Sequence, residues 1–308
     1  MKLINSKVEI LEPTGYTIDD IYKQIEIAGR TCYKSEDKIT PTSAKEFVDR
    51  MIKSGHGAML EHGTVYLKYF VEHYCEGLED KYNSQKEELN KLIERYAYNK
   101  YSKVNSARHP GNIFITTNFR VLVENNWLED LKYICEPTVF HEKRISVRWT
   151  CDRGVSHEFV RHRVFSFAQE STRYVNYSKD KFGNELTFII PTWLSIPEGN
   201  YTYSDGDWVD INKQVIQISE DEENVHSFLN TLDCSEYQYT MLINAGWKPQ
   251  QARQVLPNAL KTELVMTGFE SDWKHFFELR CDTAAHPDAR KLALELYNKL
   301  YNKEYGKE

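Results

Sequence analysis

The sequence is poor in cysteine, and the cysteines it has form no recognisable pattern. Six are scattered along the chain without a close pair, namely Cys32, Cys75, Cys135, Cys151, Cys234 and Cys281. This spacing excludes a disulfide framework and a zinc ligand set. No apolar run approaches the roughly 20 residues that span a bilayer, and the N-terminus lacks the apolar segment of a signal peptide. We therefore expect a reduced, cytoplasmic protein without membrane contacts.

An excess of positive charge is also missing. The 308 residues carry a net charge of −7, which argues against broad nucleic-acid binding. Charged residues make up 28% and hydrophobic residues 41%, as in a folded globular protein. There is no internal repeat, low-complexity tract or clear linker. We therefore predict a single domain over residues 1–308.

What the sequence contains is a mixture of strand and helix patterns. Alternating segments predict strands over residues 7–11, 64–71, 142–150, 185–190 and 261–267. Capping residues and apolar periodicity predict helices over 17–30, 43–54, 118–124, 126–135, 219–244, 271–279 and from 287 onward. The predicted caps of three of these are Thr17 or Asp19, Ser43 and Ser219. Residues 72–101 are charged and helix-friendly, which is typical of a surface insertion. The expected fold is α+β, with a central mixed or antiparallel sheet flanked by helices.

The richest stretch for chemistry is Arg161–Tyr174, which reads RHRVFSFAQESTRY. Arginine forks suit phosphates and the carbonyl edges of flat rings, and histidine donates or accepts near neutral pH. These groups suit a flat phosphorylated ligand such as a nucleotide. A helix capped by Ser156 and continued through this stretch would place His162, Ser166, Gln169 and Arg173 on one polar stripe.

Several of these patterns have plainer interpretations. HEFVRH resembles a zinc-protease motif, but the second histidine of such a motif stands four residues after the first. That position is Arg161 here, so we reject zinc. Arg161–Arg163 alone would also suit a solvated basic patch, and Ser171 with Thr172 a plain turn. In SGHGAMLEH, His56 and His62 are either ligands or turn residues.

The arrangement of RHR, seven residues, Ser171, Arg173 and Tyr174 resembles the signature of flavin-dependent thymidylate synthases. Two later segments are also similar to that family. QARQVLPNALKTEL resembles its Ala-Arg-x-x-Leu-Pro segment, and FFELR resembles its Phe-Leu-x-Leu-Arg segment. The similarity covers roughly residues 43–70 and 153–290. It implies the fold of that family for the whole catalytic domain.

The resemblance implies a role for each matching residue. For the flavin it implies His56, with Glu61 and His62 as companions, and also Arg161, His162, Arg163 and His275. For dUMP it implies Ser171, Arg173, Tyr174, Arg253 and Arg280. Arg280 would face the pyrimidine, where a guanidinium stabilises negative charge developing on the uracil carbonyl. We therefore expect Arg280 to be the catalytic residue.

The chain also departs from the family pattern. Asn-Glu-Gln-Ser is replaced by Ala168–Ser171, so neither Gln169 nor Glu170 is given a chemical role. Asn-Ala-Arg is replaced by Phe269–Ser271, and His275 stands where an asparagine commonly meets the flavin. The chain is longer than a typical member. We therefore predict a helical, family-atypical insertion over residues 72–142.

The activity implied by the resemblance is the reductive methylation of dUMP to dTMP. Methylenetetrahydrofolate would supply the carbon, and FAD reduced by NADPH would supply the hydride. Members of the family are homotetramers whose active sites combine residues from several subunits. The alternative is a non-catalytic nucleotide- or nucleic-acid-binding protein of the same fold, which the departures would favour.

Overall fold

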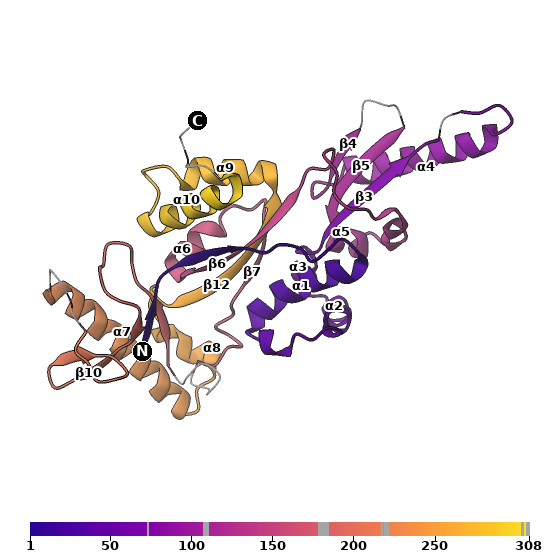
Figure 1. Ribbon diagram of the computed structural model, residues 1–308. Helices are drawn as coiled ribbons and strands as arrows, with labels where there is room; N and C mark the ends of the chain where they lie inside the picture. Colours follow the sequence, from indigo (N-terminus) through magenta and orange to yellow (C-terminus); the bar gives the residue numbers. More distant parts are fainter. Residues whose placement is uncertain are drawn as a thin grey trace.

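The structure, a computed structural model, describes residues 1–72, 74–106, 111–177, 185–216, 218, 222–302 and 305. Figure 1 shows an elongated molecule with a twisted antiparallel sheet at its centre and helices on both faces of that sheet. This arrangement confirms the expected α+β class with an antiparallel central sheet. That residues 1–308 form one catalytic domain stays a prediction.

The central sheet has four strands in the order β2-β6-β12-β7. They are β2 (Lys7–Ile10), β6 (Arg144–Asp152), β12 (Lys261–Phe269) and β7 (Ser166–Gln169). All neighbouring pairs are antiparallel, and β6 pairs with β12 along the full length of both strands. Three of these strands were predicted, whereas β7 lies where the sequence analysis placed a helix.

The two faces of this sheet are covered by different helices (Figure 1). On one face lie α1 (Ile18–Tyr33), η1 (Glu36–Lys38), α2 (Ser43–Lys53) and α3 (Gly57–Leu60). On the other lie α6 (Arg153–Phe159), α9 (Glu270–Arg280) and α10 (Pro287–Tyr301). Val265 of β12 packs toward α1, and its neighbours Leu264 and Met266 pack with Trp149 and Trp273 toward α9. The alternation of strand side chains thus builds a core on each face.

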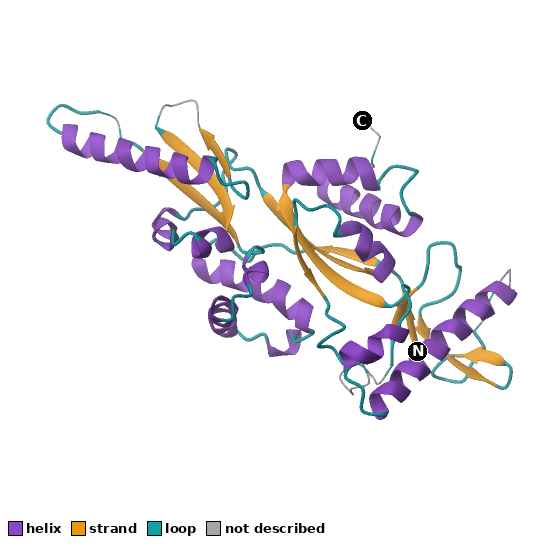
Figure 2. Cartoon of the chain, turned by 180° about the vertical axis from the view of Figure 1, so that it is seen from behind, coloured by secondary structure: helices purple, strands orange, loops and turns teal. Residues whose placement is uncertain are grey.

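A second sheet, in the order β3-β5-β4, lies at one end of the molecule (Figure 2). It contains β3 (Thr64–Phe70), β4 (Lys103–Ser106) and β5 (Asn112–Asn118), with α4 (Glu79–Ala97), α5 (Phe119–Glu124) and η2 (Leu128–Tyr133) beside them. The expected helices of this region are present. Strands β4 and β5 were not predicted. Because they lie between residues 72 and 142, this segment is not wholly helical. Whether this segment is atypical of the family stays a prediction.

The opposite end of the molecule holds a third core, around Phe188, Tyr201, Trp208 and Tyr239. Strand β1 (Lys2–Ile4) lies between β8 (Thr187–Ile189) and β9 (Gly199–Asn200), and β10 (Thr202–Ser204) pairs with β11 (Asp207–Val209). The helices here are α7 (Glu222–Asn244), α8 (Pro249–Ala252) and η4 (Arg253–Val255). The predicted cap of α7, Ser219, lies outside the described residues.

Local hydrogen bonds explain where the helices begin. Thr17, one of the two predicted caps of α1, is the cap in the structure, because its Oγ1 accepts from Asp20 N at 3.3 Å. Ser43 is not the predicted cap of α2; its Oγ donates to Glu26 Oε2 at 2.9 Å instead. Asp152 rather than Ser156 caps α6, since its Oδ1 accepts from Val155 N at 2.9 Å. No helix in the described part of the chain is long and apolar enough to cross a membrane.

Candidate functional site

The stretch Arg161–Tyr174 is not one helix, so the predicted polar stripe is wrong. Helix α6 ends at Phe159, and Ser166–Gln169 forms β7, an edge strand paired with β12. The reason lies in the residues, because Ser166 and Ala168 are buried while Phe167 and Gln169 are less so, which is a two-residue period. The strand separates the candidate residues of this stretch, because His162 precedes it and Ser171, Arg173 and Tyr174 follow it.

The group around His162, which we call the arginine group, consists of Glu158, His162 and Arg280. Arg280 ends α9, and its guanidinium is bound on three sides. Its Nη1 donates to Glu158 Oε2, its Nη2 donates to the Glu158 carbonyl at 2.8 Å, and its Nε donates to His162 Nε2 at 3.0 Å. A guanidinium held this way presents its charge in one fixed plane.

His162 is kept neutral inside this group. Burial, together with the nearby charges of Arg280 and His275, lowers its pKa to about 4. Its ring packs against Phe276 at 5.0 Å between centroids. Because Nε2 accepts from Arg280, the ring proton belongs on Nδ1. His162 is therefore a hydrogen-bond acceptor that orients Arg280, in addition to its predicted place beside the flavin.

Three other residues predicted to contact the flavin lie on the surface around this group. Arg161 and Arg163 are exposed on either side of His162. The His275 side chain is 66% exposed and lies 3.2 Å from Glu278 Oε2. These side chains are accessible to a ligand, and their role toward the flavin stays a prediction.

The group around the turn that follows β7, which we call the turn group, consists of Tyr33, His56, Ser171, Arg173 and Tyr174. Ser171 N donates to the Cys32 carbonyl at 3.0 Å, which holds the turn against the end of α1. Ser171 Oγ accepts from Arg173 N at 3.3 Å, the bond of the plain serine turn considered above. The backbone of the turn is thus fixed while the Arg173 and Tyr174 side chains face solvent.

Aromatic contacts join His56 to this turn. Tyr33 OH lies 2.9 Å from His56 Nδ1, and the Tyr33 ring lies 5.7 Å from the Tyr174 ring. The Arg173 guanidinium lies 5.3 Å from the centre of the Tyr174 ring. The structure therefore brings together residues that are more than a hundred positions apart in the sequence, and that were predicted for two different ligands.

The predicted companions of His56 have structural partners of their own. Glu61 Oε1 accepts from Arg120 Nη1 at 2.5 Å. His62 is buried, with 1% of its surface exposed, and its Nδ1 lies 2.8 Å from Thr267 Oγ1. Burial, together with the nearby charge of Arg144, lowers the pKa of His62 to about 3. His62 is therefore an uncharged core histidine.

Arg253 joins the turn group from η4. Its Nη1 donates to Thr172 Oγ1 at 3.3 Å, which places a second guanidinium beside the turn that carries Ser171 and Arg173. In the described part of the chain neither Arg173 nor Arg253 pairs with a carboxylate. Two uncompensated guanidinium groups at one turn form a suitable site for a phosphate.

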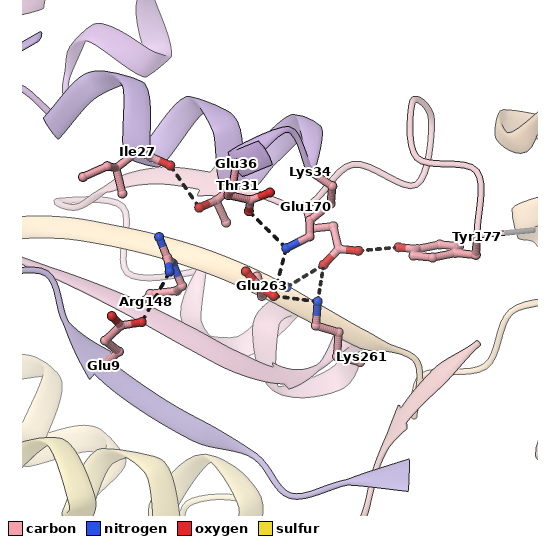
Figure 3. A network of polar contacts seen from close by, with 10 residues as sticks. All are labelled: Glu9, Ile27, Thr31, Lys34, Glu36, Arg148, Glu170, Tyr177, Lys261 and Glu263. Atoms are coloured by element: carbon pink, nitrogen blue, oxygen red, sulfur yellow. Dashed lines mark hydrogen bonds and ion pairs between the residues drawn. The ribbon is translucent and has the colours of Figure 1, made fainter. Parts of the chain in front are cut away.

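A buried polar network lies directly under this turn (Figure 3). Glu170 is 2% exposed, and its carboxylate accepts from Lys261 Nζ at 2.9 Å and from Tyr177 OH at 2.8 Å. Glu263 lies 2.7 Å from Lys261 Nζ and 3.0 Å from Lys34 Nζ. Burial opposes the charge on Glu263, but the two lysines outweigh it and lower its pKa to about 2. The network ties the turn to α1 and β12.

Sequence reasoning missed the roles of Glu158 and Glu170. Glu158 stands three residues before Arg161, and it is the only carboxylate that contacts Arg280 in the described part of the chain. Glu170 follows an alternating strand at a position where its side chain is buried. Each glutamate stands next to a cationic motif in the sequence, which was the one sign of a role. The cation that each glutamate pairs with lies about ninety residues or more away in the chain. Gln169 contacts Ser156 Oγ at 2.8 Å and so has a structural role.

Comparison with known proteins shows a consistent similarity. The profile of a family described as thymidylate synthase complementing protein matches residues 81–303. A flavin-dependent thymidylate synthase of Corynebacterium aurimucosum is 24% identical over 276 residues, which cover 88% of this chain and 72% of that protein. Those of Geobacter sulfurreducens and Pyrococcus furiosus are 29% and 30% identical, over 47% of this chain.

The chain spans about half the length of the last two relatives, 50% and 49% respectively. Among solved structures, a UMP/dUMP methylase PolB from Streptomyces cacaoi bound with 5-Br dUMP aligns with 98% of this chain and 93% of its own. The sequence identity is 17% and the TM-score 0.42.

Proposed function

This chain belongs to the family of flavin-dependent thymidylate synthases, and from that premise we propose that it converts dUMP to dTMP. Methylenetetrahydrofolate donates the carbon, and NADPH reduces the FAD. Bound FAD supplies the hydride that completes the methyl group. The protein contributes orientation and fixed positive charge.

The observation that carries this proposal is the fixed guanidinium of Arg280. Glu158 and His162 together hold all three of its nitrogens, so it keeps one orientation. Such a group stabilises the negative charge that develops on a uracil carbonyl without rearranging during the reaction. Arg280 is the residue we assign to the pyrimidine.

The turn group supports a role in holding the phosphate of dUMP. Arg173 and Arg253 lie on either side of Thr172 without carboxylate partners in the described part of the chain. The network around Glu170 fixes the backbone beneath them. A rigid turn with two guanidinium groups binds a dianion at small entropic cost. Ser171 and Tyr174 complete this side of the site.

The residues assigned to FAD fit a flat, anionic cofactor. Arg161 and Arg163 are exposed cations with ends suited to a diphosphate. His275 is largely exposed, and His56 lies at the surface beside Tyr33. These residues would bind the cofactor, whereas the buried His62 would not touch it.

A homotetramer with shared active sites also belongs to this proposal. Its support is the separation of the arginine group from the turn group by β7 within one chain. A substrate that touches both groups would lie between subunits. The cytoplasmic location stays a prediction.

The alternative of a non-catalytic binding protein has one observation in its favour. The segment that replaces Asn-Ala-Arg serves the fold, because Phe269 is buried and Ser271 Oγ donates to Glu142. The Phe269 side chain is therefore not available to a flavin, and the exposed Ser271 side chain is bonded to Glu142.

The test is the visible absorption spectrum of the purified protein, recorded without oxygen before and after NADPH and dUMP are added. We expect a flavin spectrum that bleaches on reduction, and dTMP once methylenetetrahydrofolate is present. A colourless protein that cannot be reconstituted with FAD would contradict the proposal and support the binding-protein alternative.

A further inference from the structure

A cavity of about 250 Å³ lies between α1, the start of β6 and the loop that follows β2. Its walls include Gln24 and Ile27 of α1, Thr64 and Tyr66 of β3, and Arg144 of β6. It therefore sits where the end sheet joins the central sheet (Figure 1). His62, the buried histidine that does not touch the flavin in the proposed function, lines it, and none of the residues assigned to FAD or dUMP does.

Arg144 is the distinctive group in this cavity. Its Nη1 donates to the Glu61 carbonyl at 3.0 Å and to Thr64 Oγ1 at 3.3 Å, and its Nη2 donates to Ser166 Oγ at 3.4 Å. Its Nε has no hydrogen-bond partner. The guanidinium lies 5.6 Å from the Phe269 ring. None of these hydrogen-bond partners is charged, and the carboxylates of Glu61 and Asp272 act on the guanidinium only from beyond ion-pair distance.

Within the described part of the chain, the lack of an ion pair sets Arg144 apart from the sequestered cations Arg30, Lys261 and Arg280. Arg30 pairs with Glu26 at 2.8 Å, Lys261 pairs with two carboxylates, and Arg280 pairs with Glu158. Arg144 has no ion pair within the residues that the structure describes. Burial lowers its pKa to about 10, which reflects the cost of holding an unpaired charge away from water. An anion that enters the cavity would remove that cost.

The remaining walls define what kind of anion fits. Ile27, Ile145, Val265 and Leu300 give an apolar surface, and the Tyr16 and Tyr66 rings meet edge to face at 5.7 Å. The cavity is smaller than the usual 300–1,000 Å³ or so of drug-sized sites, so it holds one ring or a short branched chain. Lys143 and Glu12 also line the cavity with opposite charges, so the net positive charge of the walls is that of Arg144. A single net charge matches a singly charged carboxylate better than a dianionic phosphate.

We propose that this cavity binds a small organic carboxylate, with its charged end on Arg144 and its apolar body between α1 and Tyr66. Such a ligand would bridge the two sheets, because Tyr66 and Thr64 belong to β3 while Arg144 and Ser146 belong to β6. The site is separate from the proposed synthase chemistry. Its test therefore needs no turnover.

The test is titration calorimetry of the whole chain with benzoate, with its neutral analogue benzamide and with inorganic phosphate. We expect benzoate to bind with a Kd of about 1 mM or tighter and benzamide to bind about tenfold more weakly or worse. Arg144→Met should weaken benzoate binding about tenfold or more. The matched control is Arg148→Met on the same strand, which removes an arginine bound to Glu9 outside the cavity and should leave benzoate affinity unchanged.

A second variant keeps the test decisive if Arg144→Met does not fold. Ile27→Phe fills the cavity and retains Arg144, so it should abolish benzoate binding while the circular dichroism spectrum stays that of the wild type. No benzoate binding by the wild type, equal affinity in the Arg144 and Arg148 variants, undiminished binding by Ile27→Phe, or binding of phosphate in place of benzoate would each overturn the proposal.

Discussion

Single residues of the arginine group decide how charge is presented to a ligand. Glu158 neutralises Arg280 from one side, and His162 contributes an acceptor without adding a charge, because burial keeps its pKa at about 4. The group as a whole therefore carries no net charge at neutral pH. How this group acts on a ligand therefore depends on the direction of the Arg280 guanidinium and not on an excess of positive charge.

Replacing Arg280 with alanine tests this arrangement. We expect Arg280→Ala to lower kcat/KM for dUMP about 100-fold or more, as removal of a transition-state donor does. The flavin absorbance of the purified variant should be unchanged, because the flavin is assigned to other side chains. Steady-state kinetics and a visible spectrum measure both. Loss of flavin with unaltered dUMP binding would contradict the assignment.

The buried histidine His62 predicts how stability depends on pH. Its pKa of about 3 in the folded protein lies below the ordinary 6.5. Its contribution to the free energy of unfolding is therefore complete above pH 6.5 and is lost as the pH falls toward 3. When the pH is lowered from about 7 to about 5, the wild type should lose about 2 kcal/mol more free energy of unfolding than the His62→Gln variant. Urea unfolding at the two pH values measures this difference. Equal losses in both proteins would show that His62 is not buried and neutral.

At the scale of elements, β12 must pass close to an aromatic ring. A Cβ built on Gly268 would lie 2.3 Å from Phe165 Cδ1, so the strand needs glycine there. Gly268→Ala should destabilise the fold by about 2 kcal/mol through overpacking. Urea unfolding of this variant, of Phe165→Leu and of the double variant completes a cycle. The double variant should lose about 1 kcal/mol less free energy of unfolding than the two single variants lose together. A loss equal to their sum would contradict the contact.

The strands and helices show how much of the fold the sequence predicts. Segments with a regular period and a clear end, such as α1 with its Thr17 cap or the β6 and β12 strands, were predicted to within a few residues. β7 was missed, because four residues of alternation followed a helix whose pattern seemed to continue. β4 was also missed, because its side chains are mostly exposed and its stability comes from pairing with β5.

The candidate site divides in the same way. The resemblance predicted Arg173, Arg253, His162 and Arg280. In the structure Arg280 contacts His162, and Arg253 contacts the turn that carries Arg173. The partners Glu158, Tyr33 and Glu170 could not be predicted, because their contacts join segments distant in sequence. Only the folded sheet brings such pairs within hydrogen-bond distance.

At the scale of the whole molecule, the division into an arginine group and a turn group predicts complementation between subunits. Arg280→Ala and Arg253→Ala remove one residue from each group and should each be nearly inactive alone. If the active site lies between subunits, mixed tetramers refolded together should regain about a quarter of wild-type activity, as expected from random pairing of two defects. Activity assays after co-refolding, with each variant refolded alone as the control, measure this. No recovery, with tetramers shown by sedimentation, would place the whole site in one subunit.

The order of strands in the central sheet has a consequence for how the chain is made. The partners β2, β6 and β12 lie at residues 7–10, 144–152 and 261–269, so most of the chain must leave the ribosome before β12 can join β6. The end sheet, by contrast, is contiguous over residues 64–118 and can form during synthesis. Distant strand pairing is slow and leaves unpaired edges open to misassociation in the meantime. The sheet that positions both groups is therefore the last to be completed. The chain should need chaperones most before β12 has left the ribosome.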